Sequence, residues 1–133
     1  MRLAVLSDIH SNKVALSACI KDIKESSVDG ICLLGDYISD CPNPQATISL
    51  LKELMKNYRT WIIKGNREQY LISHDDGIED GWKYTSYKGS LLYTYESLTK
   101  EDIDYLRGLP IKCTINIEGT EPTLLLHGSQ RNI

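Results

Sequence analysis

The feature that most constrains the fold is a repeated order of short apolar runs, each followed by polar or glycine residues and then by a helix-like pattern. These runs occupy residues 3–6, 31–34 and 61–63. After the first and second runs, apolar residues recur at the three- and four-residue spacing of a helix. Strands that alternate with helices predict an α/β chain with a parallel sheet and right-handed crossover connections.

The second half of the chain has a weaker pattern. Residues 68–90 contain several acidic residues and glycines, and we expect a loop or cap inserted there. Helical patterns return at 91–97 and 100–107. Two strand-like runs follow, 111–117 and 123–126, and the second is apolar enough for an interior strand. Such a strand, so near the chain end, would expose an unpaired edge that a second copy of the chain could cover.

Length and composition set the broad class. The chain has 133 residues, of which 41% are hydrophobic, so we predict a single domain over 1–133 with a real core. A net charge of −3 argues against binding to nucleic acid through charge alone. The longest apolar runs are far too short for a membrane helix or a secretory signal, which predicts a cytoplasmic protein. The cysteines lack Cys-x-x-Cys spacing, and Cys19 and Cys32 are expected to be buried free thiols.

Polar residues of metal-ligand type follow the apolar runs. Asp8 and His10 follow the first run, Asp36 the second, Asn66 the third and His127 the last. Each has a simple structural explanation when taken singly, such as a helix cap or a turn. Because the carboxyl ends of parallel strands meet at one edge of a sheet, the set favours a metal centre. Imidazole and oxygen ligands together suit manganese, iron, zinc or nickel, and the two oxygens of Asp36 could bridge two ions.

Four short motifs also occur in the order and spacing typical of a known family. They are Asp8-x-His10, Gly35-Asp36, Gly65-Asn66 and His127-Gly128. The chain resembles the calcineurin-like metallophosphoesterases, and residues 3–12 are particularly similar to the small bacterial phosphodiesterase-like branch.

The resemblance implies a layered α/β/β/α sandwich and two divalent metal ions, with manganese expected first. Asp8, His10 and Asp36 would hold one ion, and Asp36, Asn66 and His127 the other. The implied reaction is hydrolysis of a small phosphate ester, with diesters preferred, by a hydroxide that bridges the metals. Asp36, Asn66 and Arg67 are then the expected catalytic residues, and a nucleotide is one expected substrate.

Two departures from the family pattern bear on activity. Arg67 stands where the family usually has a histidine, and an arginine binds phosphate but does not donate a proton at neutral pH. His74 is an alternative proton donor, although a solvated role is favoured for it. The family's C-terminal Gly-His-x-His motif is absent after His127, so we expect a chain that is incomplete at its C-terminus.

These departures keep alternative functions open. The chain could be a catalytically silent or truncated relative that binds phosphate or a partner. A receiver-type signalling domain fits poorly, because the first strand is not followed by an acidic pair. Trp82, Tyr84 or Tyr87 could stack on a nucleobase, but packing of the cap is the favoured interpretation.

Overall fold

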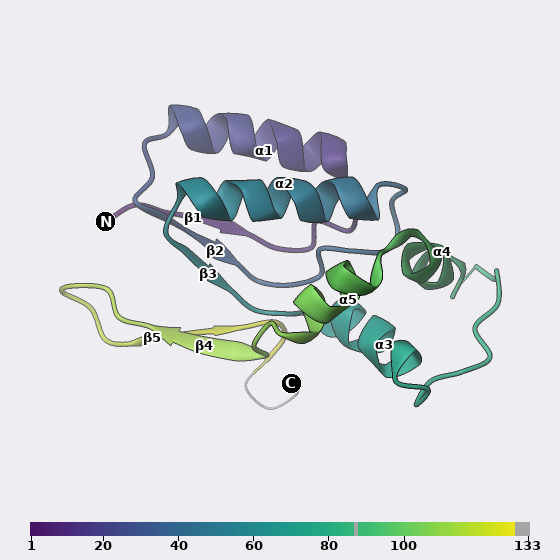
Figure 1. Cartoon of the computed structure of the whole chain (residues 1–133). Coiled ribbons are helices and arrows are strands. Elements are labelled where there is room, and N and C mark those ends of the chain that lie inside the picture. The colour runs from purple at the N-terminus through teal and green to yellow at the C-terminus, as the bar shows by residue number, and fades with distance from the viewer. Residues whose placement is uncertain (87, 130–133) are drawn as a thin grey trace.

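The computed structural model describes residues 1–86 and 88–129. Its first half alternates strands and helices, and the three strands form a parallel sheet in the order β1-β2-β3. Figure 1 shows α1 and α2 side by side over one face of this sheet. The α/β class and the parallel sheet predicted from the sequence are confirmed. The elements are β1 (Leu3–Leu6), α1 (Lys13–Glu25), β2 (Gly30–Leu33), α2 (Pro44–Asn57) and β3 (Thr60–Ile62).

The second half supplies three short helices and a hairpin. In Figure 1 the helices lie at the end of the sheet from which the connections to α1 and α2 leave, and the hairpin lies on the face opposite α1 and α2. Two sheets therefore face each other, with a helical layer outside the first. The elements are α3 (Asn66–Asp75), α4 (Gly89–Ser97), α5 (Lys100–Arg107), β4 (Lys112–Ile115) and β5 (Thr123–Leu126).

The core follows from the alternation of side chains along β2, which is buried on both faces. Ile31 and Leu33 point toward α1 and α2 and pack in the larger hydrophobic cluster. Cys32 points the other way and packs with Ile115 and Leu125 of the hairpin. The central strand therefore joins the two layers, and the prediction that Cys32 is buried is confirmed.

Cys19 is exposed, so the prediction that it is buried is wrong. In α1 the buried residues are Leu16 and Ile23, with Ile20 packed against the same cluster. A helix that covers only one side of a sheet buries a narrow stripe, and Cys19 lies on the flank of that stripe.

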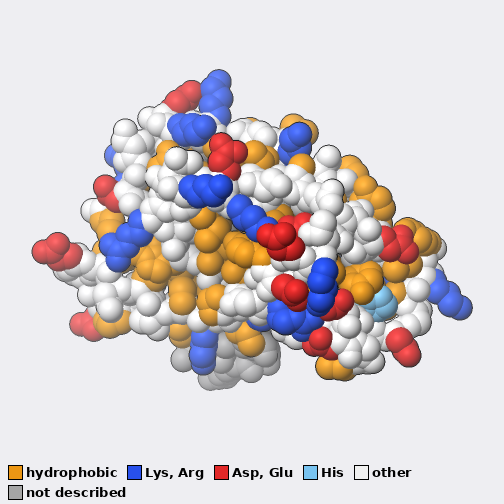
Figure 2. Space-filling view, in the orientation of Figure 1, with side chains coloured by type: hydrophobic (Ala, Val, Ile, Leu, Met, Phe, Trp, Pro, Cys, Tyr) orange, Lys and Arg blue, Asp and Glu red, His pale blue; other side chains and the backbone are white. Residues whose placement is uncertain are grey.

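The loop expected from residue 68 begins only after α3. At the start of this helix the Glu68 side chain accepts a hydrogen bond from the amide of the N-cap residue Gly65. Leu71 and Ile72 are the buried apolar residues of the helix. Asp75 at its end forms ion pairs with Lys100 and Arg107 of α5. Figure 2 shows acidic and basic side chains gathered where α3 and α5 lie in Figure 1. The acidic residues that suggested a loop therefore include helix residues paired with a neighbouring helix.

The last strand is not an interior strand of the parallel sheet. β5 pairs antiparallel with β4 in a separate two-stranded sheet, and Leu124 is 42% exposed. Within the described residues, no helix is both long and apolar enough to cross a membrane.

Candidate metal centre

Two loops meet where β1 and β2 end, and backbone hydrogen bonds join them. The Asp8 amide donates to the Gly35 carbonyl at 3.1 Å, and the His10 amide donates to the Asp36 carbonyl at 3.0 Å. Asp8, His10 and Asp36 adopt φ values of 55°, 49° and 54°, in the left-handed region. Aspartate tolerates this region better than most residues, and the paired loops hold all three side chains beside one another.

The third loop fits against the second only because both carry glycine. A Cβ on Gly35, whose φ is +95°, would lie 2.5 Å from the Gly65 nitrogen. A Cβ on Gly65 would lie 2.1 Å from Oδ1 of Asp36. Real Cβ atoms do not approach other atoms so closely, so these glycines allow the start of α3 to contact Asp36.

Asp36 lies at the centre of the candidate ligands and is 4% exposed. Its Oδ1 accepts a hydrogen bond from the Arg67 amide at 2.9 Å. Its Oδ2 lies 3.4 Å from Nε2 of His127 and 4.0 Å from Nε2 of His10. Both oxygens of Asp36 are expected from the sequence to bridge two ions, whereas in the structure Oδ2 alone faces both imidazoles.

His127 reaches this site from β5. Its Nδ1 lies 2.7 Å from the Leu34 carbonyl, and its Nε2 lies 3.1 Å from Oδ1 of Asn66. A neutral imidazole has one N–H, so a bond to the carbonyl leaves the Nε2 lone pair facing oxygens of Asn66 and Asp36. Electron-rich atoms at these distances repel one another unless a proton or a metal ion lies between them, and the combination of imidazole and oxygen donors fits a divalent metal ion.

His10 makes a second, overlapping group. Its Nε2 lies 3.6 Å from Oδ1 of Asp8 and, as above, faces Oδ2 of Asp36. One ligand atom from each of Asp8, Asp36 and His127 also lies within 4.8 Å of the other two. The candidate ligands therefore lie around the Asp36 carboxylate, and the converging group of Asp8, Asp36 and His127 takes members from both ligand sets that the resemblance implies.

Glu68 is a residue of this site that sequence reasoning missed. Its side chain is fully buried, and Oε2 accepts hydrogen bonds from the amides of Asp36 at 2.9 Å and Gly65 at 2.8 Å. Its Oε1 accepts from the Tyr37 amide at 2.8 Å. Burial raises the pKa of Glu68, and the Asp36 carboxylate adds to that rise, while the three N–H donors oppose it. The position three residues after a helix N-cap was the available signal.

Arg67 and His74 differ in their relation to the centre. The Arg67 guanidinium lies 3.5 Å from Oδ2 of Asp40, beside the candidate ligands. His74 stacks on Trp82 with ring centroids 4.0 Å apart, and Tyr95 meets the imidazole edge-on. His74 is therefore half-buried in an aromatic cluster, and the expectation that it is solvated holds only for the part of the side chain that stays exposed.

The two aromatic residues considered for base stacking differ. Trp82 is buried and packs on His74, as favoured from the sequence. Tyr84 is 64% exposed and its hydroxyl donates a hydrogen bond to Glu96, so it does not belong to this cluster. Tyr87 lies outside the described residues.

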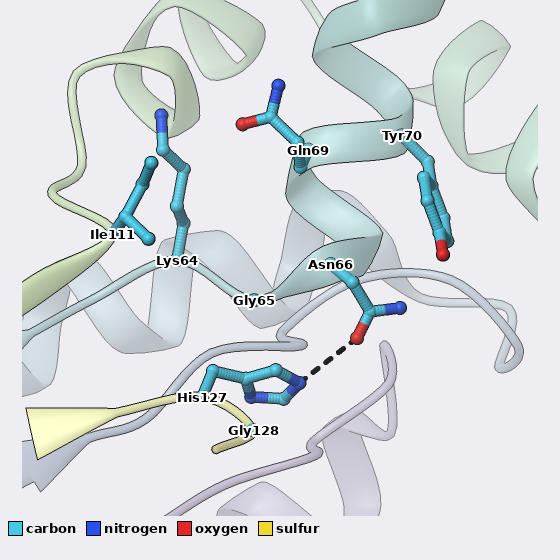
Figure 3. Close-up of a pocket in the computed structure, with 8 residues that line it drawn as sticks. All are labelled: Lys64, Gly65, Asn66, Gln69, Tyr70, Ile111, His127 and Gly128. Atoms are coloured by element: carbon cyan, nitrogen blue, oxygen red, sulfur yellow. Dashed lines mark hydrogen bonds between the residues drawn. The ribbon is translucent and has the colours of Figure 1, made fainter. Parts of the chain in front are cut away.

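A pocket of about 400 Å³ adjoins the centre beside Asn66 and His127. Figure 3 shows these two side chains pointing toward one another, with Lys64 and Ile111 on one side of the start of α3 and Tyr70 on the other. Gln69 also lines the pocket. A molecule bound at the candidate ligands could therefore place an organic group against a mixed polar and apolar surface.

Comparisons with known proteins identify the family. A sequence model of the calcineurin-like phosphoesterases matches residues 1–133. The chain belongs to the calcineurin-like phosphoesterase family. The family predicted from four short motifs is thereby confirmed. Members of this family are phosphoester hydrolases that use divalent metals, and the chain carries a candidate metal-binding group.

Relatives of this calcineurin-like phosphoesterase are longer proteins. The uncharacterized protein MJ0912 of Methanocaldococcus jannaschii is 31% identical over 121 residues, which cover 88% of this chain and 45% of that protein. The crystal structure of the hypothetical protein PH1004 from Pyrococcus horikoshii OT3 superposes with a TM-score of 0.83 at 29% identity, over 98% of this chain and 56% of that one. A metallophosphoesterase from Sphaerobacter thermophilus gives a TM-score of 0.65 at 28% identity, over 85% and 42%. The chain thus spans about half the length of these relatives.

Proposed function

We propose that this chain hydrolyses phosphodiesters of small molecules with two divalent metal ions, manganese first among them. Asp8, His10 and Asp36 would hold one ion, and Asp36, Asn66 and His127 the other. The observation that supports this proposal is the position of Oδ2 of Asp36, which faces Nε2 of both histidines. When bound, such ions neutralise phosphoryl oxygens and lower the pKa of a water molecule toward neutrality.

Arg67 has two separate roles in this proposal. Its backbone amide holds Oδ1 of Asp36, which leaves Oδ2 directed at the imidazoles. Its guanidinium, beside the candidate ligands, would bind a phosphoryl oxygen of the substrate. Because a guanidinium does not release a proton at neutral pH, we expect faster cleavage of esters whose leaving group needs no protonation.

The organic part of the ester would lie in the pocket that adjoins Asn66 and His127. Tyr70 and Ile111 offer apolar surface there, and Gln69 offers an amide for hydrogen bonding. This surface suits an aromatic or nucleoside group better than a long charged chain. The proposed substrates therefore include nucleotides.

The test is hydrolysis of a chromogenic phosphodiester, bis-p-nitrophenyl phosphate, with and without Mn²⁺. We expect turnover that requires Mn²⁺ and falls at least about a hundredfold in Asp36→Ala, because both ligand groups lose their shared carboxylate. Asp22→Ala is the matched control, since Asp22 lies exposed on α1. Turnover that is independent of Mn²⁺, or equal in Asp36→Ala and the wild type, would overturn the proposal.

A second candidate function is binding without catalysis. Its support is Arg67, which stands where the family usually has a histidine and forms an ion pair with Asp40. In that case the chain would bind Mn²⁺ and inorganic phosphate but would not turn over either a diester or a monoester. Calorimetry with Mn²⁺ and phosphate, run beside the hydrolysis assay, separates the two candidates.

A further inference from the structure

Asp40 lies outside the candidate ligands, yet its carboxylate contacts three elements of the site. Its Oδ2 lies 3.2 Å from Nδ1 of His10 and 3.5 Å from the Arg67 guanidinium. Its Oδ1 accepts a hydrogen bond from the Ser90 hydroxyl of α4 at 3.0 Å. Through Asp40, the loop after β2 therefore contacts the loop after β1 and the helices α3 and α4.

We propose that Asp40 is a positioning residue that fixes the orientation and the tautomer of His10. This inference rests on the proposed function, in which Nε2 of His10 binds a metal ion. An imidazole whose Nδ1–H donates to Asp40 keeps the Nε2 lone pair free, and that atom faces Asp8 and Asp36. A carboxylate in this position also makes the imidazole a stronger ligand.

The backbone places Asp40 for this role. Ser39 and Asp40 have φ values of 74° and 62°, so the chain makes a tight left-handed turn. The Cys41 amide donates to the His10 carbonyl at 3.1 Å, which fixes this turn against the backbone of His10. The Ser39 hydroxyl lies 3.4 Å from Nδ1 of His10 with hydrogen-bond geometry, and Oδ2 of Asp40 lies nearer, at ion-pair distance. The carboxylate is both nearer and charged, so the proposal assigns the Nδ1–H to Asp40.

The other contacts of Asp40 allow matched variants. Ser90→Ala removes the link to α4 and leaves the contact with His10 in place. Asp40→Asn keeps an acceptor oxygen but removes the charge, whereas Asp40→Ala removes both. If Asp40 acts by orienting His10, the order of Mn²⁺ affinity among these variants differs from the order expected if Asp40 only holds the loop.

The first measurement needs neither metal nor activity. The chain contains three histidines, so a long-range ¹H–¹⁵N spectrum of the metal-free protein is simple to assign with the aid of His10→Gln. At a pH where imidazoles are neutral, we expect the Nδ1–H tautomer of His10 in the wild type and in Ser90→Ala, and loss of that preference in Asp40→Ala. An Nε2–H tautomer of His10 in the wild type would overturn the inference.

The second measurement is Mn²⁺ affinity by calorimetry. We expect Asp40→Ala to weaken binding about 10- to 100-fold, Asp40→Asn to weaken it less, and Ser90→Ala to leave it nearly unchanged. In a His10→Ala background the effect of Asp40→Ala should disappear. If that effect persists there, Asp40 acts by holding the loop and the inference is wrong. A wild type that binds no Mn²⁺ overturns the proposed function, while the tautomer of His10 still decides the contact with Asp40.

Discussion

Glu68 is the residue at which the structure makes its most direct prediction about stability. Its buried carboxylate is the acceptor for three backbone amides, those of Asp36, Tyr37 and Gly65. These amides belong to two loops that are far apart in the sequence and carry candidate ligands. Replacing Glu68 with alanine leaves all three N–H groups without their acceptor.

The magnitude follows from the number of bonds. A buried amide without an acceptor costs about 1–3 kcal/mol, so Glu68→Ala should lower the free energy of unfolding by about 3–5 kcal/mol after partial relaxation. Glu68→Gln keeps two bonds if its oxygen occupies the position of Oε2, and only the Tyr37 amide then faces an NH₂ group. It also removes a charge that burial disfavours, so we expect a loss of about 1–2 kcal/mol.

Urea unfolding at neutral pH, followed by circular dichroism, measures both variants. Glu53→Ala is the control, because Glu53 is exposed on α2 and should change the free energy of unfolding by less than about 0.5 kcal/mol. The expected order of destabilisation is Glu68→Ala, then Glu68→Gln, then the control. If the free energy of unfolding of Glu68→Ala lies within about 1 kcal/mol of the wild-type value, the three hydrogen bonds do not stabilise the paired loops and the reasoning is refuted.

Two further predictions concern the contact of Gly65 with Asp36 and the ion pairs of Asp75. Gly65→Ala places a methyl group 2.1 Å from Oδ1 of Asp36. We therefore expect a lower free energy of unfolding and, in calorimetry, Mn²⁺ binding that is at least about tenfold weaker. Gly108→Ala is the control, because its added Cβ would meet nothing nearer than 3.5 Å. Unchanged Mn²⁺ affinity in Gly65→Ala would contradict the prediction. The Lys100 ammonium, with help from the Tyr95 hydroxyl and Arg107, lowers the pKa of Asp75, so this carboxylate stabilises the fold above its unfolded pKa and loses that contribution as pH falls through the lowered folded value. The free energy of unfolding of the wild type should therefore exceed that of Asp75→Asn by about 1 kcal/mol at neutral pH, and this difference should shrink below about pH 3.8. A difference in the free energy of unfolding that stays constant with pH would count against the ion pairs.

The sequence alone determined the class of fold and the family. Alternating strand and helix patterns are local signals, since each depends on residues within one or two turns or strands. Helix starts depend on equally local contacts: the Asn12 side chain accepts a hydrogen bond from the Ala15 amide in α1, and the Thr99 side chain accepts one from the Asp102 amide in α5. The polar residues at strand ends were also readable, because parallel strands bring their carboxyl ends to one edge.

The tertiary structure decided how those residues meet. Oδ1 of Asp36 accepts a hydrogen bond from the Arg67 amide at the start of α3, and Oδ2 faces the imidazoles of His10 and His127. No spacing in the sequence reveals this division between the two oxygens. His127 arrives from an antiparallel hairpin and not from the parallel sheet. Glu68 and Asp40 contribute through partners about thirty residues away. Burial and charge at such contacts depend on three-dimensional packing, so local patterns could name the ligands but not the groups that hold them in place.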